Sequence, residues 1–309
     1  MGPPAGRRHR RAPSDAASRR SRRSVDRGCD AGRGHRPMIE DVSAPVHPAA
    51  WHDRPWPRAL FTAIQFLTRL PVPGGQTRDL TTFPEDIRRG LVFFPLIGAL
   101  VGGLTALALV LLEIALPWPV AVIAALAVEA RLTGAFHEDA VADFCDALGG
   151  GWTREQVLEI MKDSRVGSYG ALGLGLGVAL RASALVALSS LLQAVVVLVV
   201  AGAIGRLVIL FVMALVPPIA GREGLSKDVG QQAGWGTVLA GLALVSPVLI
   251  LGAAVDPGAM IGATVVLAVF LAWYRAMLLR RLGGVTGDCL GFSAYAGIVV
   301  TTLAFARNT

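Results

Sequence analysis

Long apolar runs divide most of this 309-residue chain and leave little choice of fold. A helix needs about 20 mostly apolar residues to cross the hydrocarbon core of a bilayer. The composition agrees with that reading, since 53% of the residues are hydrophobic, 17% are charged and the mean hydropathy is +0.57. The sequence therefore predicts an all-α, polytopic membrane bundle of about seven transmembrane helices. The predicted spans are 90–116, 118–136, 168–191, 194–216, 235–254, 258–279 and 290–306.

The first part of the chain differs in composition from the rest. Residues 1–37 hold 11 of the 29 Lys and Arg residues but only three of the 22 acidic ones, and they contain no apolar stretch like that of a secretory signal. We expect residues 1–58 to be a basic, disordered leader, with a start at Met38 as the alternative. The membrane-embedded domain is then 59–309. Because the net charge of +7 belongs to the leader, nucleic acid is not an expected partner.

A short apolar segment and the placement of the cations complete the expected topology. Residues 59–70 are too short to span and are followed by Pro71 and Pro73, which predicts an N-terminal interfacial or re-entrant helix. Lys and Arg are concentrated in alternate connections between the spans. The positive-inside rule places these connections in the cytoplasm. We therefore expect a multi-pass protein of the bacterial cytoplasmic (inner) membrane whose active site faces the cytoplasm.

A row of carboxylates follows the second predicted span. Asp139, Asp143 and Asp146 are four and three residues apart, so on a helix they share one face. Like charges stacked in this way repel one another, and a divalent cation such as Mg²⁺ relieves the repulsion by taking carboxylate oxygens. The three are predicted metal ligands, and Asp143 and Asp146 are also candidate catalytic residues. A solvated helix end is the alternative, which a mixture of charges would suit better than this acidic set.

The loop after this row has the chemistry of a phosphate contact. Its candidate substrate-binding residues are Lys162, Asp163, Ser164 and Arg165, followed by two glycines that allow close backbone approach. Ordinary membrane anchoring is the alternative for the two cations. His137, two residues before Asp139, is a candidate catalytic base, a phosphate contact or a support for its neighbours, although a lone histidine is more often structural.

Two more sets of polar residues lie in or near the spans. A Gly-rich turn opens the last span and offers Thr286, Gly287 and Asp288 as substrate contacts, the aspartate also as a metal or ribose contact. Arg181 and Arg206 lie well inside predicted spans, so each should face a polar cavity or pair with a carboxylate. Arg206 is the better candidate for binding an anionic substrate. Glu129 is expected near the outer interface or paired with Arg131.

Taken together, the motifs resemble those of the cobalamin synthase family, also called adenosylcobinamide-GDP ribazoletransferase. No single segment is specific, but those at 159–167 and 284–291 are specific as a pair. The sequence departs from the usual family pattern at Glu138, Ala140 and Ala147, where an apolar residue and two glycines are common. The matching segments, in the family's order between about 59 and 306, are 66–73, 94–98, 137–143 with Asp146, 159–167, 205–206 and 284–291.

The resemblance implies a reaction that suits these residues. In the family, α-ribazole or its 5′-phosphate attacks the diphosphate of adenosylcobinamide-GDP, which gives adenosylcobalamin or its phosphate and releases GMP. The acidic row would hold Mg²⁺ on the diphosphate, while Lys162 and Arg165 would neutralise phosphate oxygens, with Arg206 as a further candidate. The two substrates and the lipid bilayer are the expected partners. A homo-oligomer and an association with other cobalamin-assembly enzymes both stay open.

Two other classes of membrane protein share some of these sequence features. A CDP-alcohol phosphotransferase also carries an acidic row at the membrane edge, but its D-G-x2-A-R opening is absent, since Ala142 and Asp143 stand in that register. An ion-coupled transporter would favour charges along the membrane midplane and related halves of the chain. The sequence shows no internal repeat, and its polar segments gather at one end of the predicted bundle.

Overall fold

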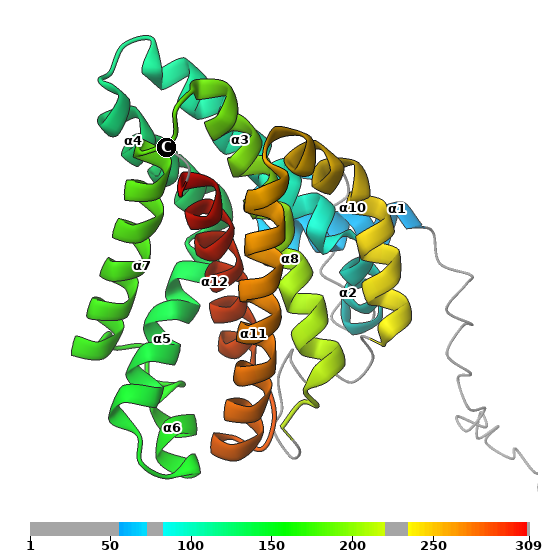
Figure 1. Cartoon of the computed structure of the whole chain (residues 1–309). Coiled ribbons are helices and arrows are strands. Elements are labelled where there is room, and N and C mark those ends of the chain that lie inside the picture. Colours follow the sequence, from blue (N-terminus) through cyan, green and yellow to red (C-terminus); the bar gives the residue numbers. More distant parts are fainter. Residues whose placement is uncertain (1–55, 73–82, 220–233, 308–309) are drawn as a thin grey trace, which may run out of the picture. The chain divides into compact units, whose positions relative to one another are not determined.

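The computed structural model describes residues 56–72, 83–219 and 234–307, and within them the secondary structure is helical apart from one isolated bridge between Pro218 and Val285 (Figure 1). The described part of the chain forms eleven α-helices, and a short 3₁₀ helix, η2 (Leu91–Phe93), leads into α3. The α-helices are α1 (Trp56–Leu67), α2 (Phe83–Gly90), α3 (Phe94–Glu113), α4 (Trp118–Thr133), α5 (Phe136–Gly150), α6 (Arg154–Ile160), α7 (Ser168–Val186), α8 (Leu191–Leu215), α10 (Trp235–Val255), α11 (Pro257–Arg281) and α12 (Gly287–Ala306).

 Ten of these α-helices have eight residues or more, while α6, with seven, is a short connecting helix.

Six helical segments are long and apolar enough to cross a bilayer, namely α2 with α3, α7, α8, α10, α11 and α12. A seventh crossing is counted only if α4 and α5 form one broken span, because they bend by 90° at their junction. The prediction of an all-α bundle with about seven spans is therefore confirmed. The predicted span at 118–136 corresponds to α4, which ends at Thr133 and counts as a crossing only together with α5.

The predictions for the beginning of the chain are only partly accessible. The predicted interfacial helix at 59–70 corresponds to α1, which is too short to cross a bilayer. Of the predicted leader 1–58, residues 1–55 lie outside the described residues, and residues 56–58 belong to the first turn of α1. The basic connections within 73–82 and 220–233 lie outside the described residues as well.

Helix α8 is the most deeply buried of the candidate spans and carries the packing of the bundle. Its sequence is an almost unbroken apolar run that begins after an N-cap, where the Ser190 hydroxyl accepts a hydrogen bond from the Gln193 amide at 3.1 Å. A Cβ on Gly98 of α3 would collide with the carbonyl oxygen of Gly202 on α8, and the converse also holds. The two backbones are therefore in direct contact, as small residues permit in membrane bundles.

The opposite side of α8 meets α12 in a similar way. A Cβ on Gly205 would lie 2.7 Å from the carbonyl oxygen of Ala294, and one on Gly297 would lie 3.2 Å from the Cα of Gly205. Helix α12 packs along α8 within the bundle. Because both faces of α8 are fixed by backbone contact, α3 and α12 have little freedom to shift.

The bend between α4 and α5 sets the direction of the helix that carries the acidic row. It consists of Gly134 and Ala135, whose φ angles of 72° and 56° both lie in the left-handed region. That region suits glycine but strains alanine, at a cost on the order of 1 kcal/mol. The backbone amide of Arg69, just after α1, donates a hydrogen bond to the Leu132 carbonyl at 2.7 Å. The end of α1 thus supports the bend from outside.

The contact between α3 and α8 can be tested with two glycines of the same helix. Gly98→Val is expected to lower the free energy of unfolding by at least about 1–3 kcal/mol, because the added side chain meets backbone that cannot move aside. Gly103→Val is the matched control, since a Cβ there meets nothing within 4 Å. Thermal unfolding of the purified variants in detergent measures the difference, and equal losses would contradict the described contact.

Candidate functional site

The acidic row lies on α5, and the predicted helical register is confirmed. The helix turns Val141, Phe144 and Ala147 into the bundle, where all three are buried. The ring of Phe144 stacks on that of Phe292 of α12 with 4.1 Å between centroids. On its other side, Asp139 is exposed, while Asp143 and Asp146 are partly exposed. The apolar face therefore fixes the helix, and the carboxylates are left at its accessible side.

Asp143 lies at the centre of the acidic groups. The charges that act on it are those of Asp139 and Asp146 from its own helix and that of Asp288 from the first turn of α12. The structure thus brings the Gly-rich turn and the acidic row together, as the sequence predicted. Four carboxylates concentrated here produce a negative potential that a cation would relieve.

Close packing between α5 and α12 makes this approach possible. A Cβ on Gly291 would collide with the Cβ of Ala140, so the two helices are in contact at this point. Ala140 is one of the positions that depart from the usual family pattern, where glycine is common. Here the glycine on the facing helix accommodates the larger residue. Ala147, the second such position, is fully buried against the interior of the bundle.

Asp146 has a structural role that the sequence did not indicate. One of its carboxylate oxygens accepts a hydrogen bond from the Gly167 amide at 2.6 Å, and the other accepts one from the Gly170 amide at 2.8 Å. These amides belong to the N-cap residue and the first turn of α7, whose positive end favours an anion. Asp146 therefore caps α7 from a different helix. A side chain at either glycine would collide with the carboxylate.

The loop between α6 and α7 carries the predicted cationic contacts. Arg165 donates hydrogen bonds from its backbone amide and its Nε to Asp163, at 3.1 and 3.0 Å, while Lys162 and Ser164 are exposed. The hydrogen bonds from Arg165 lower the pKa of Asp163 to about 2. A depressed carboxyl pKa means that the pair is intact at neutral pH and is lost only as the pH falls toward that value.

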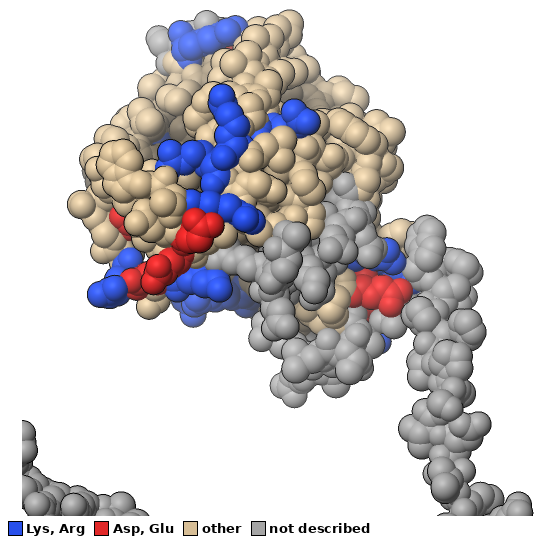
Figure 2. Space-filling model, turned by 90° about the horizontal axis from the view of Figure 1, so that it is seen from below, with Lys and Arg blue, Asp and Glu red and all other residues tan. Residues whose placement is uncertain are grey.

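Hydrogen bonds connect this loop region to the other polar segments at the same end of the bundle. The predicted Thr153 N-cap of α6 is confirmed, with Gln156 completing a capping box. From α6, the Nε of Arg154 donates to the Leu282 carbonyl at 2.7 Å. The Val285 amide in turn donates to the Pro217 carbonyl at 2.9 Å. Figure 2 shows acidic and basic side chains gathered on this face.

The predicted residues of the Gly-rich turn have different surroundings. Thr286 is the N-cap of α12, and its buried hydroxyl lies 3.1 Å from the sulfur of Met161 and 3.2 Å from that of Cys289. Gly287 is exposed, and a Cβ there would meet nothing within 4 Å. Of this turn, Gly287 and Asp288 are accessible, while Thr286 stabilises the start of the helix.

A set of buried charges lies behind the acidic row. Glu129 of α4 receives two hydrogen bonds from Arg181 of α7, at 3.0 and 2.7 Å, and a third from the Thr105 hydroxyl of α3 at 3.0 Å. The expectation that Arg181 pairs with a carboxylate is confirmed. The expectation for Glu129 is wrong, because it pairs with Arg181 inside the bundle and not with Arg131 or at an interface. Three helices are joined just before the α4–α5 bend.

Arg206 and His137 are buried near this pair, with 1% and 3% of their surfaces exposed. Within the described residues, the Nε and Nη1 atoms of Arg206 and the Nδ1 atom of His137 have no hydrogen-bond partner. Arg206 comes from α8, and His137 comes from the first turn of α5. Neither reaches the accessible side of the acidic row, so their predicted contacts with substrate need a path into the bundle and stay predictions.

The carboxylate oxygens of the acidic row are ligands of the type that Mg²⁺ prefers, but their positions do not form a complete binding site. Within the described ranges, no three His, Cys, Asp or Glu side chains gather closely enough to hold a metal ion by themselves. Mg²⁺ keeps several waters and is commonly bound through one or two carboxylates together with substrate phosphates. Carboxylates on one helix face fit that mode of binding, in which the substrate supplies part of the coordination.

The fold and the site define a polytopic helical membrane protein with an acidic helix face near one end of its bundle. Comparison with known proteins gives the family. The model of the cobalamin-5-phosphate synthase family matches residues 59–306, so the chain belongs to that family. The resemblance predicted from the motifs is therefore confirmed, and neither the CDP-alcohol phosphotransferase nor the transporter is favoured. No solved structure matches the chain.

Curated relatives agree with the family assignment. The adenosylcobinamide-GDP ribazoletransferase of Leptothrix cholodnii is 42% identical over 245 residues, which cover 76% of this chain and 89% of the relative. The enzyme of the same name from Ralstonia nicotianae is 40% identical and covers 76% and 90%. That from Rhizobium etli is 38% identical and covers 79% and 94%. The similarity extends over nearly the whole length of each relative.

The capping role of Asp146 predicts a loss of stability that its neighbour does not share. Asp146→Ala removes both acceptors for the amides at the start of α7, so we expect the free energy of unfolding to fall by about 1–2 kcal/mol. Asp139→Ala, on the same helix face but exposed, is the control and should change stability by less than about 0.5 kcal/mol. Thermal unfolding of the metal-free protein measures both, and similar values for the two variants would contradict the capping role.

The buried pair predicts a larger effect. Glu129→Gln leaves the Arg181 guanidinium buried without a charged partner, and breaking such a pair typically costs about 3–5 kcal/mol. Glu113→Gln, at the exposed end of α3, should have almost no effect. Denaturant or thermal unfolding in detergent compares the two. The structural role of the pair is refuted if Glu129→Gln is as stable as the control.

Proposed function

We propose that this chain is an adenosylcobinamide-GDP ribazoletransferase of the cytoplasmic membrane, dependent on Mg²⁺ and with its active site at the cytoplasmic end of the bundle. The family membership and the names of the relatives support the reaction. The observation that carries the proposed site is the convergence on Asp143 of carboxylates from two helices, beside a loop that holds Lys162 and Arg165. The position of the cations in alternate connections supports the cytoplasmic orientation.

The proposed reaction is a displacement at phosphorus. A hydroxyl of α-ribazole, or of its 5′-phosphate, forms a new bond to the phosphorus that carries the cobinamide, and the bond from that phosphorus to the oxygen of GMP breaks. The hydroxyl proton passes to a base, and GMP leaves with the bridging oxygen. Catalysis of this kind depends mainly on positioning and on neutralising phosphate charge. The residues of the site are suited to both tasks.

Asp139, Asp143 and Asp146 are the residues that would hold Mg²⁺, and Asp288, whose charge acts on Asp143, is a further candidate. The ion, when bound, would neutralise charge on the diphosphate. Asp146 can serve in this way while it caps α7, because each carboxylate oxygen has a second lone pair. Lys162 and the Arg165 side chain would contact phosphate oxygens from the loop, with Ser164 as a neutral donor.

The candidate bases differ in accessibility. The acidic row is open to solvent at Asp143, which is partly exposed, whereas His137 is 3% exposed and surrounded by the bundle. A base must reach the proton that it removes, directly or through one water. We therefore assign the base to a carboxylate of the row and give His137 a supporting role. Arg206, equally buried, would act on the substrate only through its neighbours.

The proposal is tested by release of GMP from adenosylcobinamide-GDP, with α-ribazole as acceptor and purified protein in detergent. We expect release that requires Mg²⁺ and falls on addition of EDTA. Asp143→Asn should lower kcat by at least about 100-fold, because it removes a charge needed in the transition state. Glu155→Gln, on an exposed turn of α6, is the control and should keep its activity.

Two results would contradict different parts of the proposal. Absence of GMP release from wild-type protein, under conditions in which a known relative is active, would remove the reaction. Full activity in the presence of EDTA, or in Asp143→Asn, would leave the reaction in place and remove the proposed metal site. Complementation provides an independent test of the reaction: a ribazoletransferase-deficient strain should grow when it expresses the wild-type chain.

A further inference from the structure

An exposed aromatic ring lies beside the acidic row, and the proposed reaction gives it no task. Tyr169, in the first turn of α7, is 55% exposed. It stands between Gly167 and Gly170, whose amides donate hydrogen bonds to Asp146. The same contacts that cap α7 therefore hold Tyr169 next to a residue of the proposed metal site.

The ring of Tyr169 packs on one side against the backbone of α5. A Cβ on Gly149 would collide with the Cγ atom of Tyr169 and would lie 2.7 Å from each of its two Cδ atoms. Equal distances to these two atoms place Gly149 over the flat face of the ring and not at its edge. One face of the ring is therefore supported by α5, and the exposed surface belongs to the opposite face and the hydroxyl end.

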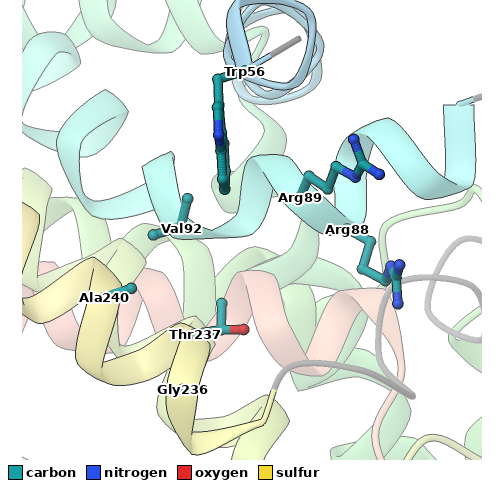
Figure 3. A pocket seen from close by; sticks show the side chains of 7 residues that line it. All are labelled: Trp56, Arg88, Arg89, Val92, Gly236, Thr237 and Ala240. Carbon is teal, nitrogen blue, oxygen red and sulfur yellow. The ribbon is translucent and has the colours of Figure 1, made fainter. Parts of the chain in front are cut away.

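Two other exposed aromatic residues near the ends of spans are packed differently. Trp56 and Trp235 contact Phe93 and Phe211 edge to face, with 6.1 and 6.2 Å between ring centroids. Figure 3 shows Trp56 extending into a pocket of about 380 Å³, which residues of α2, η2 and α10 also line. Such contacts suit tryptophans that anchor a helix at the membrane–water interface. In the described part of the chain, no aromatic ring packs on Tyr169 in this way.

The position of the ring suits a base whose phosphate lies at the acidic row. Gly149 follows Asp146 by three residues, which corresponds to about 4.5 Å of rise along α5. A nucleotide is longer than this, so its phosphate can lie at Asp146 while its base reaches Tyr169. Aromatic side chains with a free face bind such bases by stacking, which needs no hydrogen bond to the base.

We propose that Tyr169 stacks on the heteroaromatic base of a nucleotide substrate, with Gly149 as the support behind its ring. This inference rests on the proposed function, in which both substrates carry such a base: the guanine of adenosylcobinamide-GDP and the base of α-ribazole. Stacking uses the flat face that the two bases have in common. The binding of each ligand by itself shows which base the ring contacts.

The test compares full-length wild type, Tyr169→Leu, Tyr169→Phe and Leu172→Ala in detergent with Mg²⁺. Isothermal titration measures the Kd of GMP and, separately, that of α-ribazole 5′-phosphate, neither of which reacts alone. Tyr169→Leu should weaken the binding of one of them by at least about tenfold, because it loses the stacked ring. Tyr169→Phe restores the ring and should recover most of that affinity. Leu172→Ala shortens another exposed side chain, one turn further along α7, and should have no effect.

Steady-state kinetics separates stacking from a purely structural role. In Tyr169→Leu, the KM of the substrate that carries the stacked base should rise with the Kd. The kcat should stay within about twofold of wild type, because contact with an unreactive base acts equally on the ground state and the transition state.

Three results would overturn the inference: a fall in kcat at unchanged KM, an equal loss of binding in Leu172→Ala, or wild-type Kd values for both ligands in Tyr169→Leu. Each of them leaves the proposed function in place if the wild type releases GMP. Absence of that release, together with absence of binding of either ligand to the wild type, would remove the proposed function and this inference with it.

Discussion

The backbone contact between α3 and α8 is the constraint on which the rest of the structure depends. Lipid provides no strong driving force for apolar helices to associate, so close packing must supply it. Gly98 and Gly202 bring the two backbones together, and Gly205 does the same for α8 and α12. With α8 fixed on two sides, α12 has a defined position. Both helices that supply carboxylates to the proposed site are then oriented, since α5 packs on α12.

The site itself depends on polar interactions between helices that are far apart in sequence. The pair of Glu129 and Arg181 joins α4 to α7, and Asp146 joins α5 to the beginning of α7. The α4–α5 bend lies between these two connections. These two connections fix the position of α5 against α7, although α5 carries several like charges. A bound cation can therefore relieve the repulsion within the acidic row while α5 stays in place against α7.

The parts of this arrangement that the sequence predicted are those with a local signal. Spacing of four and three residues was enough for the register of the acidic row, and the residue type at Thr153 was enough for the N-cap. The bend at Gly134 and Ala135 was missed, because an apolar run with one glycine is equally compatible with a straight helix. The partners of Glu129 and Asp146 lie 52 and more than 20 residues away. Such contacts depend on how the helices pack, which periodicity does not encode.

The contact between Ala140 and Gly291 has a consequence for comparing this chain with its relatives. The two residues share one small volume at the crossing of α5 and α12, so the size tolerated at one position depends on the residue at the other. They form an epistatic pair. A larger residue at position 140 or 291 alone would push the two helices apart, whereas a smaller residue at the other position makes room for it. The residue that fits at either of these two positions therefore has to be judged together with the residue at the other.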